Sequence, residues 1–175
     1  MSKPTVARLL LLAALLAVAA ACGGRAGGEA ASGEATVARV ADGDTIVLGA
    51  GERVRLVQID ATELGEGECY GRQATEALRD LLPEETAVRL EADPALDQVD
   101  EHGRLLRYVF HGELNVNLEL VRRGAAAPYF YRGDRGRYAD DLLEAAHAAR
   151  EAGHGMWSAC DVRWDPERPA AAEPR

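Results

Sequence analysis

The order of strand-like and helix-like segments limits the fold of this chain more than any other feature. Three short runs rich in β-branched residues come first, one helical stripe follows, and two further strand-like runs come after it. The strand-like runs are 36–40, 45–48, 53–60, 86–91 and 105–111. In segment 72–82 the apolar residues from Ala74 to Leu81 recur at the spacing of one helix face, and Pro83 ends the pattern. The first three runs, joined by short turns, predict an antiparallel meander.

Three strands, a helix and two more strands are the element order of an OB-fold, a five-stranded Greek-key barrel. Two further helices are expected at 115–123, closed by Gly124, and at 138–151, followed by Gly153. We therefore predict an α+β fold, mainly β, built as a five-stranded OB-fold Greek-key barrel with three helices. The acidic loop 92–103 separates the last two strands.

Composition argues against several other classes of protein. Of the 175 residues, 47% are hydrophobic and 28% are charged, which is atypical of disordered chains and of polytopic membrane proteins. The 29 Asp and Glu residues outnumber the 20 Lys and Arg residues, so the formal net charge is −9. Proteins that coat DNA without sequence preference need a broad basic surface, which this charge argues against.

The N-terminus is typical of a processing signal. Lys3 and Arg8 precede the apolar run 9–21, which is shorter than the roughly 20 residues that a membrane span needs. We predict a signal peptide over 1–21. Small residues before Cys22 resemble a bacterial lipobox, which predicts a lipidated Cys22 and a membrane-anchored protein outside the cytoplasm. Ordinary cleavage near Ala21 would instead release a secreted protein.

The rest of the chain divides into three parts. Residues 22–35 are rich in Gly and Ala and predict a flexible tether. Residues 36–160 hold the predicted barrel domain. Residues 161–175 are rich in Pro, Ala and charged side chains without an apolar period, which predicts a disordered tail.

Two cysteines, Cys69 and Cys160, remain within the predicted domain. A pair of cysteines outside the cytoplasm is more often a disulfide than two free thiols. We expect these two to be joined, since two isolated cysteines lack the ligand spacing of a zinc site.

Candidate metal ligands occur where two neighbouring strands begin and end. Asp42-Gly43-Asp44 lies at the first turn, and Asp60 closes the third strand. A hairpin turn and a strand-end cap would explain these residues without function. The second acidic residue is unnecessary for a turn, however, and Asp44 and Asp60 could converge as a hard-oxygen site for calcium or magnesium.

Two arginines accompany these carboxylates. Arg55 lies on the third strand, and Arg104 begins the fifth. By default each would form a surface ion pair. Flanking a cation, the pair would suit the binding of a phosphate group in a transition state.

Several motifs together resemble the staphylococcal (micrococcal) nuclease family over residues 36–160. The motifs are Val40-Ala41-Asp42-Gly43-Asp44-Thr45, Val54-Arg55-Leu56-Val57-Gln58-Ile59-Asp60-Ala61-Thr62-Glu63, Asp100-Glu101-His102-Gly103-Arg104, Val116-Asn117, Leu120-Val121-Arg122-Arg123-Gly124, Tyr129-Phe130-Tyr131 and Met156-Trp157-Ser158. The resemblance implies an OB-fold phosphodiesterase that uses calcium to hydrolyse DNA and RNA, leaving 3′-phosphate and 5′-hydroxyl ends. We also expect a monomer whose substrate is DNA and RNA, and the N-terminal signal places it outside the cytoplasm.

The same resemblance implies a role for each candidate residue. Asp44, Asp60 and the backbone carbonyl of Ala61 would hold calcium, and Glu63 would activate or position the attacking water. Arg55 and Arg104 would bind the phosphate, while Tyr129 and Tyr131 would line the nucleotide pocket.

Two positions depart from the family pattern. Glu101 and His102 replace a Lys and a Tyr beside the terminal phosphate, where His102 would contact substrate and the added anion should weaken binding. Thr62 replaces a frequent Pro and should loosen the segment that presents Glu63.

The sequence is also compatible with two other functions. A non-catalytic OB-fold module could bind single-stranded nucleic acid at the cell surface. A surface scaffold protein is the second of these functions, and only the predicted tether and the net negative charge favour it.

Overall fold

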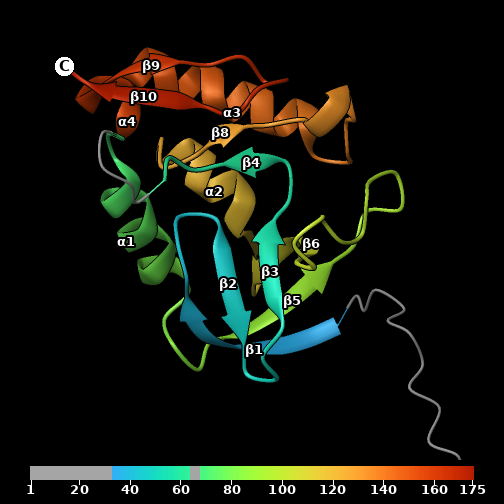
Figure 1. Ribbon diagram of the computed structural model, residues 1–175. Coiled ribbons are helices and arrows are strands. Elements are labelled where there is room, and N and C mark those ends of the chain that lie inside the picture. Colours follow the sequence, from blue (N-terminus) through green and yellow to red (C-terminus); the bar gives the residue numbers. More distant parts are fainter. Residues whose placement is uncertain (1–32, 64–67) are drawn as a thin grey trace, which may run out of the picture.

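The computed structural model describes residues 33–63 and 68–175, and Figure 1 shows their arrangement. Its elements in chain order are β1 Gly33–Val40, β2 Thr45–Leu48, β3 Arg53–Leu56, β4 Ile59–Asp60, α1 Gly71–Leu81, β5 Ala87–Glu91, β6 Leu105–His111, β7 Leu114–Asn115, α2 Val116–Arg122, β8 Ala127–Pro128, the 3₁₀ turn η1 Tyr131–Gly133, α3 Ala139–Ala152, α4 Met156–Ala159, β9 Cys160–Arg163 and β10 Ala171–Pro174. The predicted signal peptide and the lipidation of Cys22 lie outside the described residues.

The predicted five-stranded OB-fold barrel is confirmed. Strands pair in the order β3-β2-β1-β5-β6, and a parallel pairing of β3 with β6 closes the sheet on itself. The barrel interior is almost fully buried and takes one residue or more from each strand, among them Val37, Ile46, Val54, Val88 and Val109. Because successive strand residues point to opposite faces, the neighbouring Arg53 and Arg89 face outward and are exposed.

Helices cover one end of the barrel. Helix α1 packs its buried face, which includes Ala74 and Leu78, into the same core as Leu120 of α2 and Leu142 of α3. Helix α2 begins where the side chain of Asn115 accepts a hydrogen bond from the Leu118 N–H, a standard helix cap. The structure adds a fourth, four-residue helix, α4, to the three that were predicted.

The third predicted strand, 53–60, is wrong as one continuous element. It breaks between β3 and β4, where Gln58 takes a positive φ of 65° and the chain turns toward β8. Strand β4 then pairs with β8 instead of continuing the barrel. The break places β4, which ends at Asp60, beside β8 and on the side of the barrel nearer α3 (Figure 1).

The predicted tail and part of the predicted tether are also wrong. Residues 160–163 and 171–174 form the antiparallel hairpin β9–β10, which lies beside α3 and above β8 and β4 (Figure 1). At the other end, Gly33–Ala35 belong to β1 and pair with β5. In both segments backbone pairing gives order that the apolar pattern did not indicate. No helix within residues 33–63 and 68–175 is long and apolar enough to cross a membrane.

Candidate active site

Asp44 lies in the turn between β1 and β2 and is almost completely buried, with 6% of its surface exposed. Its Oδ2 accepts a hydrogen bond of 2.9 Å from the Ala61 N–H, and its Oδ1 accepts one of 3.1 Å from the Thr45 hydroxyl. Gly43 makes this approach possible, because a Cβ there would lie 2.6 Å from the Cβ of Ala61. The turn thus needs a glycine at 43 to bring Asp44 against the chain that follows Asp60.

Arg55 joins the two carboxylates that the sequence predicted to converge. Its Nη1 lies 2.8 Å from Asp44 Oδ2, and its Nη2 lies 2.8 Å from Asp60 Oδ1. Nη1 also donates a 2.9 Å hydrogen bond to the Ile59 carbonyl. The predicted convergence of Asp44 and Asp60 is therefore present, with the Arg55 guanidinium between them.

The cluster of Asp42, Asp44, Asp60 and Arg55 contains three acidic side chains and one basic side chain, and Asp44 within it is poorly solvated. Burial raises the pKa of Asp44 to about 7, and the neighbouring carboxylates of Asp42 and Asp60 add to this against the opposing charge of Arg55. Burial also raises the pKa of Asp60, although Arg55 and the Ala170 N–H oppose the shift. A bound cation would relieve this imbalance.

The oxygen donors suit a hard cation but do not enclose one. Within the described residues, no group of three or more His, Cys, Asp or Glu side chains could hold a metal ion. Asp44 and Asp60 would supply two ligands, and no described residue donates a hydrogen bond to the Ala61 carbonyl. Calcium accepts carboxylates, carbonyls and waters together, so this partial set fits calcium better than zinc.

Arg104 connects to the same network from the opposite side. Its Nε donates to Asp100 Oδ2 at 2.6 Å, and its Nη1 lies 3.5 Å from the Thr45 hydroxyl that bonds to Asp44. Burial would raise the pKa of Asp100, but hydrogen bonds from Arg104 and its charge outweigh this and lower it. Asp100 therefore stays ionised and fixes the direction of Arg104.

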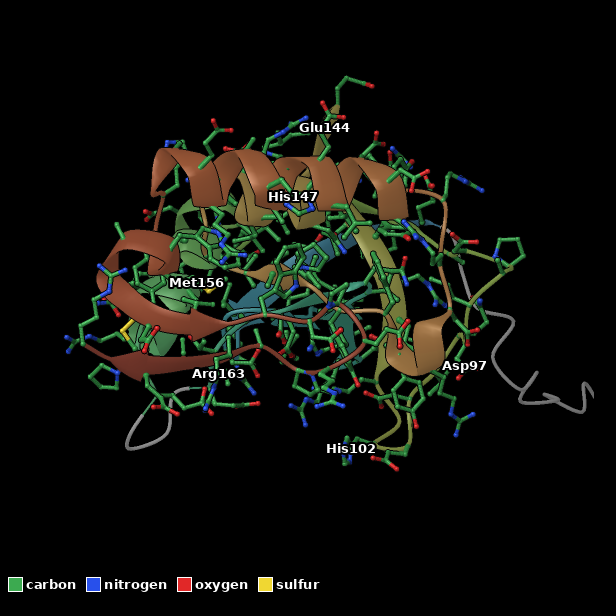
Figure 2. All side chains as sticks on the ribbon, turned by 90° about the horizontal axis from the view of Figure 1, so that it is seen from above. Asp97, His102, Glu144, His147, Met156 and Arg163 are labelled. Carbon is green, nitrogen blue, oxygen red and sulfur yellow. A yellow bond between two sulfur atoms is a disulfide. The ribbon has the colours of Figure 1, made fainter. Side chains whose placement is uncertain are left out.

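Arg55 and Arg104 both reach a cavity of about 380 Å³ on this side of the barrel. Tyr129, Tyr131 and His102 also line it, and the two tyrosine rings lie 6.5 Å apart in an edge-to-face arrangement. His102 is exposed at the outer end of its loop, on the side opposite Glu144 in Figure 2. The cavity therefore brings together the predicted phosphate-binding and substrate-binding residues.

Glu63 is not part of this hydrogen-bonded network. Its side chain is exposed, and no described residue bonds to its carboxylate. Its backbone is fixed, because its N–H donates to Glu68 Oε2 at 2.7 Å and its carbonyl lies against Gly71. A Cβ at position 71 would overlap that carbonyl oxygen, so α1 must begin with a glycine for Glu63 to lie where it does.

Sequence reasoning missed three contributors to the site. Gly43 had a signal, since it adjoins the candidate Asp44, but Gly71 is distant in sequence from Glu63, and the close contacts that require both glycines join separate parts of the chain. Ala170 had no signal, yet its N–H donates a 3.0 Å hydrogen bond to Asp60 Oδ2. The predicted pairing of Cys69 with Cys160 is present, with Cα atoms 5.9 Å apart.

Comparison with known proteins finds a matching family model and several related nucleases. The family model "Staphylococcal nuclease homologue" matches residues 53–159, more than half of the chain. The thermonuclease of Staphylococcus hyicus is 31% identical over 129 residues, which cover 70% of this chain and 74% of that protein. An uncharacterized endonuclease of Haemophilus influenzae is 33% identical over 128 residues (70% and 65%), and the thermonuclease of Staphylococcus intermedius is 37% identical over 102 residues (54% and 59%). The chain belongs to the staphylococcal nuclease homologue family.

Proposed function

We propose that this protein is a calcium-dependent nuclease that hydrolyses DNA and RNA outside the cytoplasm and leaves 3′-phosphate and 5′-hydroxyl ends. One observation carries the proposal: a single guanidinium, Arg55, joins the buried carboxylate of Asp44 and the partly buried carboxylate of Asp60 to a cavity that is also lined by Arg104 and two tyrosines. Acidic ligands beside arginines suit the binding of a cation and a phosphate at one place.

Asp44, Asp60 and the Ala61 carbonyl would hold the calcium ion. When bound, calcium supplies positive charge that polarises a phosphate oxygen. The raised pKa of Asp44 supports this assignment, because a cation would favour the ionised carboxylate. Water and substrate oxygens would complete the coordination.

Arg55 and Arg104 bind the phosphate and neutralise the charge that develops on its oxygens. Nη1 of Arg55 bonds to Asp44 and Ile59, and one hydrogen of Nη2 bonds to Asp60. The Nε–H and the second Nη2 hydrogen are therefore available to a phosphate. Arg104 uses its Nε on Asp100 and retains Nη2. Arginines in this role contribute about 10³–10⁵ in rate to other phosphoryl transfers.

Glu63 orients the attacking water. Its exposed carboxylate has no protein partner among the described residues and is free to accept a hydrogen bond from a water. Tyr129 and Tyr131 would contact the sugar or base, and His102 would lie near the outer phosphate.

A place outside the cytoplasm, with Cys22 lipidated and holding the protein at the membrane, agrees with the Cys69–Cys160 disulfide. Disulfides persist in oxidising compartments and are rare in the cytosol. Secretion without an anchor is the alternative.

The test is digestion of defined single-stranded DNA and RNA oligonucleotides by the purified chain, with calcium or with EGTA, followed by mapping of the product ends. We expect calcium-dependent cleavage that Arg104→Ala reduces by about 10³-fold or more while the variant stays folded by circular dichroism. Near-normal turnover of Arg104→Ala would contradict the assignment. Binding without cleavage would support the non-catalytic module, and neither binding nor cleavage would support a scaffold.

A further inference from the structure

The last segment of the chain, residues 160–175, packs against the site; we refer to it as the C-terminal arm. Its Trp164 Nε1–H donates to the Pro128 carbonyl at 2.9 Å, and its Pro166 carbonyl accepts from the Phe130 N–H at 2.6 Å. Its Ala170 N–H donates to Asp60 Oδ2 at 3.0 Å. The arm therefore follows the chain from β8 back to Asp60, and it lies beyond the residues 53–159 that the family model matches.

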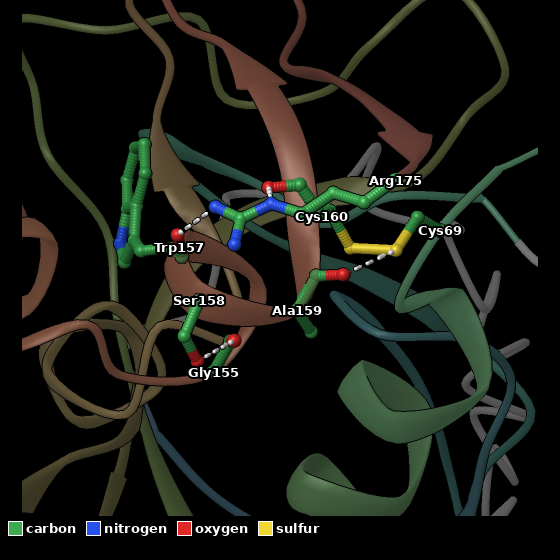
Figure 3. Close-up of a disulfide and its surroundings, with 7 residues drawn as sticks. All are labelled: Cys69, Gly155, Trp157, Ser158, Ala159, Cys160 and Arg175. Atoms are coloured by element: carbon green, nitrogen blue, oxygen red, sulfur yellow. Dashed lines mark hydrogen bonds between the residues drawn. A yellow bond between two sulfur atoms is a disulfide. The ribbon is translucent and has the colours of Figure 1, made fainter.

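The arm is fastened firmly at both ends. Figure 3 shows the disulfide from Cys69 to Cys160, and the side chain of Arg175 bonding to the carbonyls of Cys160 and Trp157. The Trp164 ring contacts the Trp157 ring with centroids 5.7 Å apart. These contacts fix the arm against α4 and the start of α1, so its hydrogen bonds have little freedom to shift.

Two positions of the arm bond to residues on either side of Glu63. Ala170 holds Asp60, which precedes Glu63, while the buried Ala172 accepts a 2.9 Å hydrogen bond at its carbonyl from the Cys69 N–H. The disulfide fixes Cys69 a second time. The arm thus sets where the chain leaves β4 and where it reaches α1.

The contact with Asp60 is compatible with cation binding. Asp60 Oδ1 bonds to Arg55 and Oδ2 bonds to Ala170, which fixes the carboxylate plane at both oxygens. An ionised carboxylate has about four lone-pair positions, so two remain free. A hydrogen bond to the outer side of a metal-binding carboxylate orients it and tunes affinity.

We propose that the C-terminal arm is a positioning element of the active site, in which the Ala170 N–H orients Asp60 for calcium and the arm fixes the segment that presents Glu63. Ala170 is a positioning residue, because it acts through Asp60 and does not touch the substrate. The proposal rests on the proposed function for its catalytic consequence. It gives this family member a part of its site that lies outside the matched family core.

The test compares Ala170→Pro, which removes the N–H, with Ala170→Gly, which keeps it in a more permissive backbone. In the full chain with calcium, Ala170→Pro should lower kcat about 10–100-fold and raise the calcium Kd by calorimetry about tenfold, with KM for DNA within twofold. Ala170→Gly should stay within twofold of wild type in all three. Trp164→Phe, which loses the bond to Pro128 and part of the ring contact with Trp157, should give a smaller loss of the same kind.

Three results would overturn the proposal. Ala170→Pro could match Ala170→Gly in kcat and calcium Kd, both variants could lose only thermal stability, or Ala170→Pro could be faster than wild type, which would make the arm inhibitory. If the wild type does not cleave nucleic acid, the proposed function is wrong. Hydrogen exchange of residues 59–63 then tests the positioning role of the arm separately. Faster exchange there in Ala170→Pro than in Ala170→Gly supports a positioning arm, and equal exchange contradicts it.

Discussion

At the scale of single residues, the site is a chain of polar contacts that crosses the end of the barrel. It runs from Arg104 through Thr45 to Asp44, and from Asp44 through Arg55 to Asp60. The carboxylates of Asp44 and Asp60 both depend on their contacts with Arg55, since an unpaired charge at a poorly solvated position would lower the stability of the fold. Burial raises the pKa of Asp44, the nearby carboxylates of Asp42 and Asp60 add to this, and the charge of Arg55 offsets it only in part.

This raised pKa makes the stability of the calcium-free protein depend on pH in a definite direction. Between the ordinary pKa near 4 of the unfolded chain and about 7, folded Asp44 holds a proton that the unfolded chain has lost. Its contribution to the free energy of unfolding is therefore full below pH 4, falls as pH rises toward 7, and is constant above. In urea titrations with EGTA, we expect the decrease in the free energy of unfolding between pH 4 and pH 8 to be smaller by about 2–4 kcal/mol in Asp44→Asn than in wild type.

The same titrations in excess calcium provide the control. Calcium should stabilise wild type more at pH 8 than at pH 5, because it binds the ionised carboxylate, and should have little effect on Asp44→Asn. Parallel pH curves for wild type and Asp44→Asn in EGTA would show that Asp44 titrates normally. They would remove the charge argument for a cation at this place.

At the scale of elements, short-range pattern predicted the barrel and long-range contacts decided the rest. Strand β5 alternates apolar and polar residues, and β1, β2 and β6 contain short runs rich in β-branched or other apolar residues, so their existence followed from the sequence. The break at Gln58 did not, because its cause is distant: Gln58 Nε2 donates to the Asp134 carbonyl at 2.8 Å, and its Oε1 accepts from the Gly136 N–H at 2.7 Å. The arm was missed for the same reason, since hydrogen bonds and a disulfide order it without an apolar period.

The same distinction between short-range pattern and long-range contacts applies to the predicted site. Asp44 and Asp60 could be expected to meet, because the strands beside them are neighbours in a meander. That Arg55 lies between them, and that Ala170 supports Asp60, depends on side-chain directions and on a return of the chain after about a hundred residues. Spacing in the sequence carries no information on either.

Gln58 gives a prediction that belongs to this scale. Its backbone carbonyl accepts a hydrogen bond from the Tyr129 N–H, and its side chain forms hydrogen bonds with the backbone of Asp134 and Gly136. Gln58 therefore supports the side of the cavity that is formed by Tyr129 and Tyr131, here called the tyrosine wall. We expect Gln58→Ala to lower the free energy of unfolding by about 1–3 kcal/mol and to raise KM for oligonucleotides severalfold with little change in kcat.

The matched variant is Gln58→Gly, which loses the same side-chain bonds but relaxes the positive φ of 65°. It should recover about 1 kcal/mol of stability relative to Gln58→Ala while keeping the raised KM. Chemical denaturation and steady-state kinetics on both variants separate the two effects. A normal KM in both would show that the tyrosine wall does not need Gln58.

At the scale of the whole molecule, an acidic protein must attract an acidic polymer. The chain carries a formal charge of −9, and the cavity mixes Arg55, Arg104 and Arg132 with the acidic residues Asp97, Asp100, Glu101 and Asp134. Charges separated by more than about 8–10 Å are largely screened at physiological salt, so the groups at the cavity should matter more than the total. Glu101 is the most informative of them, because its side chain is 85% exposed at the rim and has no arginine partner among the described residues.

Local and total charge can be separated by two variants that change the total equally. Glu101→Lys reverses a charge at the cavity, and Glu113→Lys reverses an exposed one in the turn between β6 and β7, outside the cavity lining. We expect Glu101→Lys to lower KM for single-stranded DNA about threefold or more at low salt, because it replaces a repulsion of the phosphates with an attraction. Glu113→Lys should change KM less than twofold, and about 0.5 M salt should remove most of the difference. Equal effects of the two variants on KM would mean that total charge limits the approach of substrate, and that the cavity does not recruit it locally.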